Sequence, residues 1–146
     1  MNRLYQYQVK DFALAGNAIL TLQSGKTGNH YTYKILKSNN RDDLYIVKRL
    51  YGSDNENDYE YVGCYFSDTE IFVPAKTYKD RTSLSWPPSM RAIRYFFEKI
   101  DNIPDSLIVF HEGKCGKCGK KLTTPESIRR GFGPECYKEI VNNARL

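Results

Sequence analysis

The feature that most constrains the fold of this chain is a group of cysteines near its C-terminal end. Cys115 and Cys118 form a C-x2-C pair, each followed by a glycine, and seventeen residues separate Cys118 from Cys136. Glycine lets a backbone curl tightly, so that its N–H groups turn toward the thiolates around a metal ion. A lone C-x2-C pair is a weak signal, but this spacing is typical of zinc knuckles and zinc ribbons. The pattern predicts a bound zinc ion, Zn2+, as the cofactor.

A closed structural zinc site needs four ligands, so one more donor is expected near the cysteines. Three residues separate His111 from the C-x2-C pair, and His111 lies at the end of a predicted strand. The predicted metal ligands are therefore His111, Cys115, Cys118 and Cys136, with water or Glu112 as the alternative to His111. Four protein ligands leave no position for an activated water, and the H-x-E signature of zinc deaminases is absent. We therefore expect no enzymatic activity.

Two short helices are predicted after the C-x2-C pair. Thr124 is a helix cap, Pro125 is suited to the first helical position, and Gly131 ends the segment. Pro134 then begins a second helix, which carries Cys136 in its first turn. A knuckle, a short helix and a ligand-bearing helix together predict a treble-clef-like zinc finger.

The residues before the cysteines show the alternating pattern of β-strands. Strands are expected at 17–23, 30–37, 44–50, 61–66 and 70–73, and a last one at 106–110. Pro87 and Pro88 interrupt this pattern, and a helix follows over residues 89–101, where apolar residues recur at steps of three and four. Cys64 lies within a strand and is expected in the core.

The chain is thus predicted to be α+β. Residues 1–105 form an antiparallel β-sheet with one packing helix, and residues 106–146 form the zinc-finger module. No apolar run approaches the ~18 residues of a membrane helix, and no signal peptide is evident, so we expect a cytoplasmic protein without a membrane partner. Thiols stay reduced in that compartment, which favours metal binding over disulfides.

Positive charge is concentrated in the predicted finger. Residues 111–146 hold eight Lys or Arg against four Glu, a net +4 of the chain's +5. Such a basic patch favours contact with phosphate groups, although ordinary solvation of a surface is the alternative interpretation. The expected binding residues surround the zinc: Lys114, Lys117, Lys120, Lys121, Arg129 and Arg130.

The segment HEGKCGKCGKKLTTPESIRRGFGPEC resembles a zinc-finger domain family of unknown function that is common in bacteriophages, prophages and plasmids. The residues that carry the resemblance are His111, Cys115, Cys118, Leu122, Thr123, Pro125, Ser127, Gly131, Gly133, Pro134 and Cys136. It implies a zinc finger and an origin in a mobile element, hence the cytoplasm of a bacterial host cell. It brings no established activity.

Two functions are open at this point. The basic finger predicts a binding module for nucleic acid or for a host nucleoprotein complex, with no small-molecule substrate apparent. The phage resemblance raises the alternative of a counter-defence inhibitor, such as an anti-CRISPR protein, that acts by protein–protein binding. The chain is basic, which fits poorly with an inhibitor that imitates nucleic acid.

Overall fold

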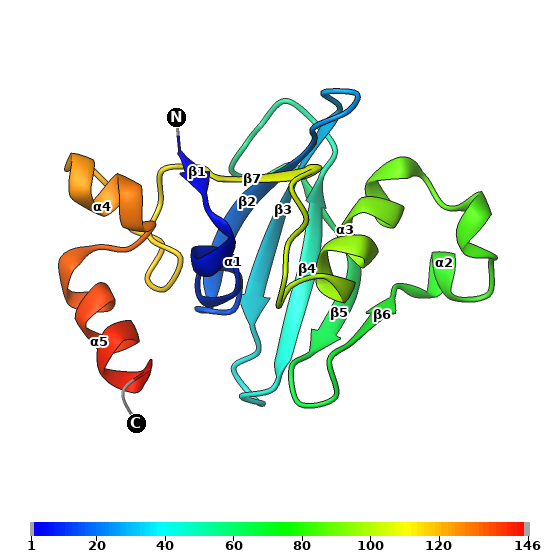
Figure 1. Ribbon diagram of the computed structural model, residues 1–146. Coiled ribbons are helices and arrows are strands. Elements are labelled where there is room, and N and C mark those ends of the chain that lie inside the picture. The colour runs from blue at the N-terminus through cyan, green and yellow to red at the C-terminus, as the bar shows by residue number, and fades with distance from the viewer. Residues whose placement is uncertain (1, 145–146) are drawn as a thin grey trace.

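A seven-stranded antiparallel sheet forms the centre of the computed structural model, which describes residues 2–144 (Figure 1). The strands lie in the order β1-β7-β2-β3-β4-β5-β6. Their bounds are β1 (Arg3–Leu4), β2 (Asn17–Ser24), β3 (His30–Lys37), β4 (Leu44–Leu50), β5 (Tyr59–Phe66), β6 (Ile71–Pro74) and β7 (Leu107–His111). The helices are α1 (Gln6–Ala13), α2 (Lys76–Lys79), α3 (Pro88–Glu98), α4 (Pro125–Arg130) and α5 (Pro134–Ala144), with a 3-10 turn at Ser83–Ser85. The predicted α+β class is confirmed.

The strands from β2 to β6 pair in chain order as a meander, as the alternating pattern predicts. β7 then returns to the other edge and inserts between β1 and β2. The finger helices α4 and α5 lie beyond this edge, at the left of Figure 1, whereas α2 and α3 lie at the right. No helix in the described part of the chain has both the length and the hydrophobicity that a bilayer crossing requires.

Helices α1 and α3 pack on the same face of the sheet. Val9 and Phe12 of α1 and Ile93 of α3 are buried in one core, together with strand residues such as Leu20 and Tyr33. Successive side chains of a strand point to opposite faces, so this core takes every second strand residue. The predicted single packing helix is thus one of two.

Helix α3 begins where the sequence predicts the end of strand structure. Pro88 occupies its first position, where the missing N–H costs no hydrogen bond. The Tyr33 hydroxyl, which is fully buried, donates to the Ser89 carbonyl at 2.6 Å and fixes this end of the helix on the sheet. Farther along, the ring of Phe97 stacks on Tyr65 with ring centres 4.3 Å apart.

The other face of the sheet carries side chains that stay partly exposed. One cross-strand row on this face runs from Ile19 through Lys34 and Lys48 to Tyr61, whose side chain is 51% exposed. Cys64 lies on this face opposite Ile46 and is half-buried, so its predicted place in the core is wrong. We call this surface the open face; its residues are Ile19, Thr32, Lys34, Leu36, Ile46, Lys48, Tyr61, Cys64 and Phe110.

Helix α1 is absent from the sequence-based prediction. Its buried residues Val9, Phe12 and Ala13 fall at helical spacing, but they occupy only eight residues in all, too few for the pattern to be distinctive. The Gln8 side chain accepts a hydrogen bond from the Tyr5 N–H at 2.9 Å and caps the start of the helix. β1 is two residues long and shows no pattern at all.

The boundary predicted after residue 105 separates β7 from the sheet to which it belongs. β7 pairs with both β1 and β2, and Val109 at its centre is buried in the common core. Leu122 and Phe132 of the finger belong to the same core as Phe12 of α1. The finger and the sheet therefore share one hydrophobic core, and the division into two domains at residue 105 stays a prediction.

Candidate metal centre

Residues 113–122 form a short hairpin, here called the knuckle, whose turn holds the first two cysteines. Lys114 and Lys121 form an antiparallel bridge at its base. At the turn, the Gly119 N–H donates to the Cys115 carbonyl at 2.9 Å. Gly119 has φ +79°, a left-handed conformation that glycine adopts at little cost. The glycine after the second cysteine is thus required by the turn itself.

The sulfurs of three cysteines converge at one place. Cys115 is buried, Cys118 is exposed and Cys136 is half-buried; all three are free thiols, and their sulfurs lie within 4.8 Å of one another. A tetrahedral zinc ion with Zn–S bonds of ~2.3 Å separates its sulfurs by ~3.8 Å. The cluster therefore has the size and the donor chemistry to hold a metal ion such as zinc.

The electrostatics of the cluster also favour a cation. Burial opposes ionisation of Cys115, but backbone N–H groups, among them those of Cys118 and Gly133, donate to its sulfur and bring its pKa below the ordinary value. Burial and the neighbouring thiols raise the pKa of Cys136 to about 11. Three thiolates this close repel one another, so a bound cation is what allows all three to be charged.

Two short helices position the third cysteine. The Thr124 hydroxyl caps α4 by accepting from the Ser127 N–H at 3.2 Å, and Gly131, with φ +81°, ends this helix. α5 begins at Pro134, which places Cys136 in its first turn. The predicted order of knuckle, short helix and cysteine-bearing helix is confirmed.

The finger docks on α1 through Phe12, whose ring is fully buried. A Cβ atom on Gly116 would lie 2.7 Å from this ring, and one on Gly131 would lie 2.8 Å from it. The ring centres of Phe132 and His111 lie 5.8 Å and 5.6 Å from that of Phe12. The lack of a side chain at Gly116 and Gly131 therefore lets the backbone of the finger contact the Phe12 ring of α1.

Strand β2 also holds the knuckle. The backbone N–H of Asn17 donates to the Gly116 carbonyl at 2.8 Å, and the side-chain amide of Asn17 donates to the Lys117 carbonyl at 2.6 Å. The Lys117 ammonium in turn pairs with the carboxylate of Glu139 on α5. Lys117 thus connects β2, the knuckle and α5 at a point between the first two cysteines.

His111 lies apart from the three cysteines, contrary to its predicted role as fourth ligand. Its ring is buried, its Nε2 lies 2.6 Å from the Ile128 carbonyl, and its Nδ1 accepts from the Gly113 N–H at 3.0 Å. Burial lowers the pKa of His111, which favours the neutral ring that these two contacts require. The pleat of β7 explains why the His111 ring is not among the cysteines. His111 pairs with Leu20, so its side chain points to the core face of the sheet, where it contacts the Ile128 carbonyl of α4.

The six basic residues predicted as a binding surface belong to two elements. Four lie on the knuckle and two at the end of α4: Lys114, Lys117, Lys120, Lys121, Arg129 and Arg130. Arg130 pairs with Glu126 at 2.6 Å and lies 4.0 Å from the ring centre of Tyr137, while Lys117 pairs with Glu139. Within residues 2–144, the other four have no ion-pair partner.

Two lysines of the open face were missed by the sequence-based prediction. Lys34 and Lys48 lie directly opposite each other on β3 and β4. The Lys34 ammonium is 4.3 Å from the ring centre of Tyr59 and donates to the Glu56 carbonyl at 2.9 Å. Burial, followed by the charges of Lys114 and Lys48, lowers the pKa of Lys34. The knuckle lysine Lys114 therefore acts electrostatically on the open face.

The fold and the site together define a small α+β protein with a three-cysteine finger at the edge of an antiparallel sheet. Residues 109–141 match the model of a family described as "Family of unknown function (DUF6011)", and the matched segment contains all three cysteines. No curated protein and no solved structure matches the chain. The family description names no activity and no phage origin, so function must be argued from the site.

Proposed function

We propose that this protein binds nucleic acid through a lysine-lined surface that runs from the knuckle onto the open face. The observation that carries the proposal is the direct opposition of Lys34 and Lys48, with Lys114 acting on Lys34 from the knuckle. Like charges placed directly across two strands destabilise a sheet. A bound phosphate relieves that repulsion, so this arrangement suits a polyanion as partner.

The aromatic side chains of the open face favour a single strand over a duplex. Tyr61 lies beside Lys48 in the same cross-strand row and is half exposed, and Phe110 is partly exposed on β7. Unpaired bases stack on such rings, with about 1–3 kcal/mol per base, whereas the bases of a duplex are already stacked. We therefore expect tighter binding to single-stranded DNA or RNA than to duplexes.

A zinc ion on the three cysteines supports this surface without contacting the ligand. Bound by Cys115, Cys118 and Cys136, the ion would neutralise the thiolates and hold the knuckle, which carries Lys114, Lys120 and Lys121. In small modules of this kind the free energy of metal binding is folding free energy. Removal of the metal is therefore expected to weaken nucleic-acid binding by disordering the knuckle.

Glu139 is our candidate for the fourth zinc ligand. It follows Cys136 by three positions on α5, and its carboxylate already reaches the knuckle through Lys117. A carboxylate oxygen is a ligand type that zinc accepts, although the Glu139 carboxylate, like His111, lies outside the group of donor atoms that converge within 4.8 Å. We expect Glu139→Gln to weaken zinc affinity by about 10- to 100-fold, measured by competition with a chromogenic chelator. Equal affinities in the variant and the wild-type protein would leave the fourth position to water.

The test of function is fluorescence anisotropy with labelled single- and double-stranded DNA and RNA at low and moderate salt. The double variant Lys34→Ala/Lys48→Ala should bind more weakly. The slope of log affinity against log salt concentration should also become shallower by about 1.4–1.8, which corresponds to the loss of two phosphate contacts. The matched control is Lys76→Ala/Lys79→Ala, which removes the same charge from two exposed lysines of α2.

Two results would contradict the proposal. One is no binding to any of the four polymers at low salt; the other is an equal loss in the test and control variants, which would reflect net charge alone. A pull-down from host lysate, with and without nuclease, then identifies the partner class. Recovery of a defined protein complex that survives nuclease treatment would favour the protein-binding inhibitor instead.

A further inference from the structure

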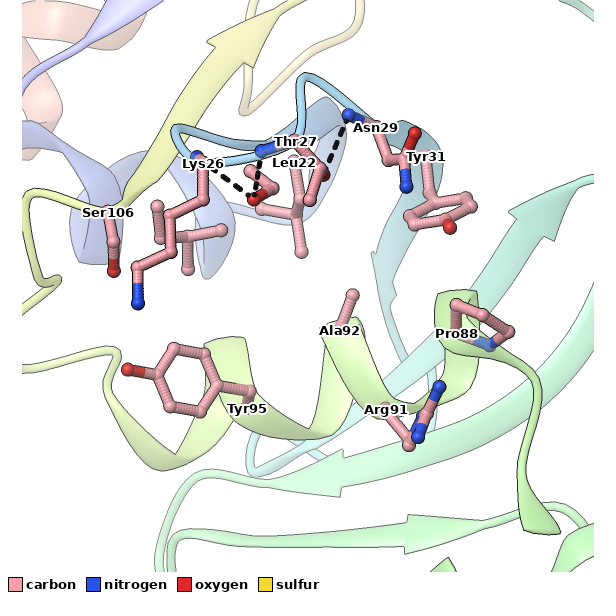
Figure 2. A pocket seen from close by; sticks show the side chains of 12 residues that line it. Leu22, Lys26, Thr27, Asn29, Tyr31, Pro88, Arg91, Ala92, Tyr95 and Ser106 are labelled. Carbon is pink, nitrogen blue, oxygen red and sulfur yellow. Dashed lines mark hydrogen bonds between the residues drawn. The ribbon is translucent and has the colours of Figure 1, made fainter. Parts of the chain in front are cut away.

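A hollow of about 420 Å³ lies between the turn that joins β2 to β3 and helix α3 (Figure 2). Leu22 and Leu107 contribute apolar surface to it, and Lys26 of the turn and Arg91 of α3 contribute positive charge. Cavities of roughly 300–1,000 Å³ are the usual size for small-molecule sites. Tyr31 also lines the hollow and shares the core side of the sheet with Leu22, so the hollow lies on the opposite face from the open face.

The charge of the hollow is positive and uncompensated. No acidic residue lines it, and within residues 2–144 neither Lys26 nor Arg91 forms an ion pair. Arg94, one turn along α3, shows the contrast, since its guanidinium pairs with Glu98 at 3.2 Å. Two exposed cations without an ion-pair partner, beside an apolar wall, suit an anionic ligand.

The turn that carries Lys26 is held by its own hydrogen bonds. The Ser24 hydroxyl accepts from the N–H groups of Lys26 and Thr27, each at 3.2 Å. The Gly25 N–H donates to the Ser106 carbonyl at 2.8 Å, which fastens the turn to the segment before β7. A ligand that meets Lys26 therefore does not have to order the backbone of the turn, and this favours affinity.

The remaining lining groups suit a planar ring that carries hydroxyl groups. Figure 2 shows Tyr95 below the ammonium of Lys26, and Tyr31 at the other end of the hollow, above Pro88 and Arg91. Tyr95 is 40% exposed and thus available for stacking. In the described part of the chain, the side-chain amide of Asn29 and the hydroxyl of Ser106 make no hydrogen bond, and both line the hollow.

We propose that this hollow binds a nucleoside monophosphate. The base stacks against a tyrosine, the phosphate meets Lys26 or Arg91, and the unpartnered polar groups of Asn29 and Ser106 bond the sugar or the base edge. A simple inorganic anion would leave the apolar and aromatic walls unused. The inference stands apart from the proposed function, because the hollow shares no residue with the knuckle or the open face.

The test is titration of the full-length zinc-loaded protein with AMP, GMP, CMP and UMP by isothermal calorimetry. We expect at least one nucleotide to bind at least about tenfold more tightly than its nucleoside and than inorganic phosphate. At least one of Lys26→Ala and Arg91→Ala should weaken binding about tenfold, the effect of losing one charge-assisted hydrogen bond. Lys79→Ala is the control for loss of an exposed cationic side chain outside the hollow, and it should bind as the wild type does.

Several results would overturn the inference. These are no binding of any nucleotide at millimolar concentration, equal binding of nucleotide and inorganic phosphate, or binding unchanged in both Lys26→Ala and Arg91→Ala. A single-stranded trinucleotide distinguishes two sources of the ligand when it is titrated in parallel against Lys34→Ala/Lys48→Ala, in which the proposed strand-binding lysines of the open face are absent. If the trinucleotide binds more weakly than the monomer, the ligand of the hollow is a free nucleotide. If it binds equally or more tightly, the ligand is one nucleotide unit of a strand. Failure of Lys34→Ala/Lys48→Ala to affect polymer binding would leave this result untouched.

Discussion

Phe12 is the residue at which the finger and the sheet region meet, because its buried ring touches two finger glycines and lies against Phe132 and His111. At this scale the chemistry of the cysteines can be read directly from the sequence, since a thiol has few other uses in a C-x2-C turn. The role of His111 cannot, because an imidazole serves equally well as a ligand or as a buried hydrogen-bonding group. The register of β7 decides between these roles.

Close contact between Gly116 and Phe12 makes a sharp test of docking. Gly116→Ala should destabilise the protein by ~1–3 kcal/mol, because its Cβ would overlap the Phe12 ring. Gly133→Ala is the matched control: it also changes a finger glycine, but a Cβ there meets no atom within 4 Å. Urea unfolding of the two zinc-loaded variants measures the difference, and equal midpoints would contradict the packing described for Phe12.

His111 and Cys118 should behave differently when replaced. His111→Gln should cost ~1–3 kcal/mol of stability through lost buried hydrogen bonds, yet keep zinc at the wild-type level. Cys118→Ser should lose zinc although Cys118 is exposed and contributes little to packing. Zinc content by elemental analysis, beside urea unfolding, separates the two roles. Loss of zinc from His111→Gln would instead show that His111 is a zinc ligand, as the sequence predicts.

At the scale of elements, the sequence predicts six of the strands, α3 and both finger helices within a few residues, because their periodicities and caps are local properties. It misses β1, α1 and α2, which are too short to show a pattern, and it does not show that β7, beyond the predicted boundary at residue 105, belongs to the sheet. Strand order is not local: nothing in residues 107–111 indicates that β7 inserts between β1 and β2. For the same reason the opposition of Lys34 and Lys48 appears only when the register is known.

The place of β7 in the sheet predicts how truncated chains behave. Residues 1–105 lack β7, which leaves β1 without its partner and uncovers the edge of β2. Residues 1–112 keep both pairings and the buried Val109. We therefore expect the longer fragment to give a cooperative thermal transition and the shorter one to be unfolded or much less stable. Equal transitions in circular dichroism would show that the sheet folds independently of β7.

Chelation of the metal should act on the finger and spare the sheet. The backbone hydrogen bonds of the knuckle surround the cysteine cluster, whereas those of β2 to β5 belong to the meander. Hydrogen exchange with and without a chelator should show lost protection in residues 113–122 and at the start of α5, with the β2 to β5 amides unchanged. Loss of protection throughout the chain would instead show one cooperative unit.

At the scale of the whole molecule, the sheet separates two surfaces with different chemistry. The open face carries lysines and aromatic rings and continues onto the knuckle, while the core side carries α1, α3 and the small cationic hollow. The finger lies at one edge and joins these parts through Phe12 and β2. The lysine-lined surface begins at the knuckle, whose turn holds two cysteines of the cluster, so we expect a metal on that cluster to be needed for binding.

Metal content of the purified protein tests this account most directly. Elemental analysis by mass spectrometry should find about one zinc per chain in the wild-type protein and almost none in Cys118→Ser. Hydrogen exchange on the same samples shows whether the knuckle depends on that ion. A wild-type protein that contains no metal, while residues 113–122 remain protected from exchange, would contradict the central claim that a metal on Cys115, Cys118 and Cys136 holds the finger together.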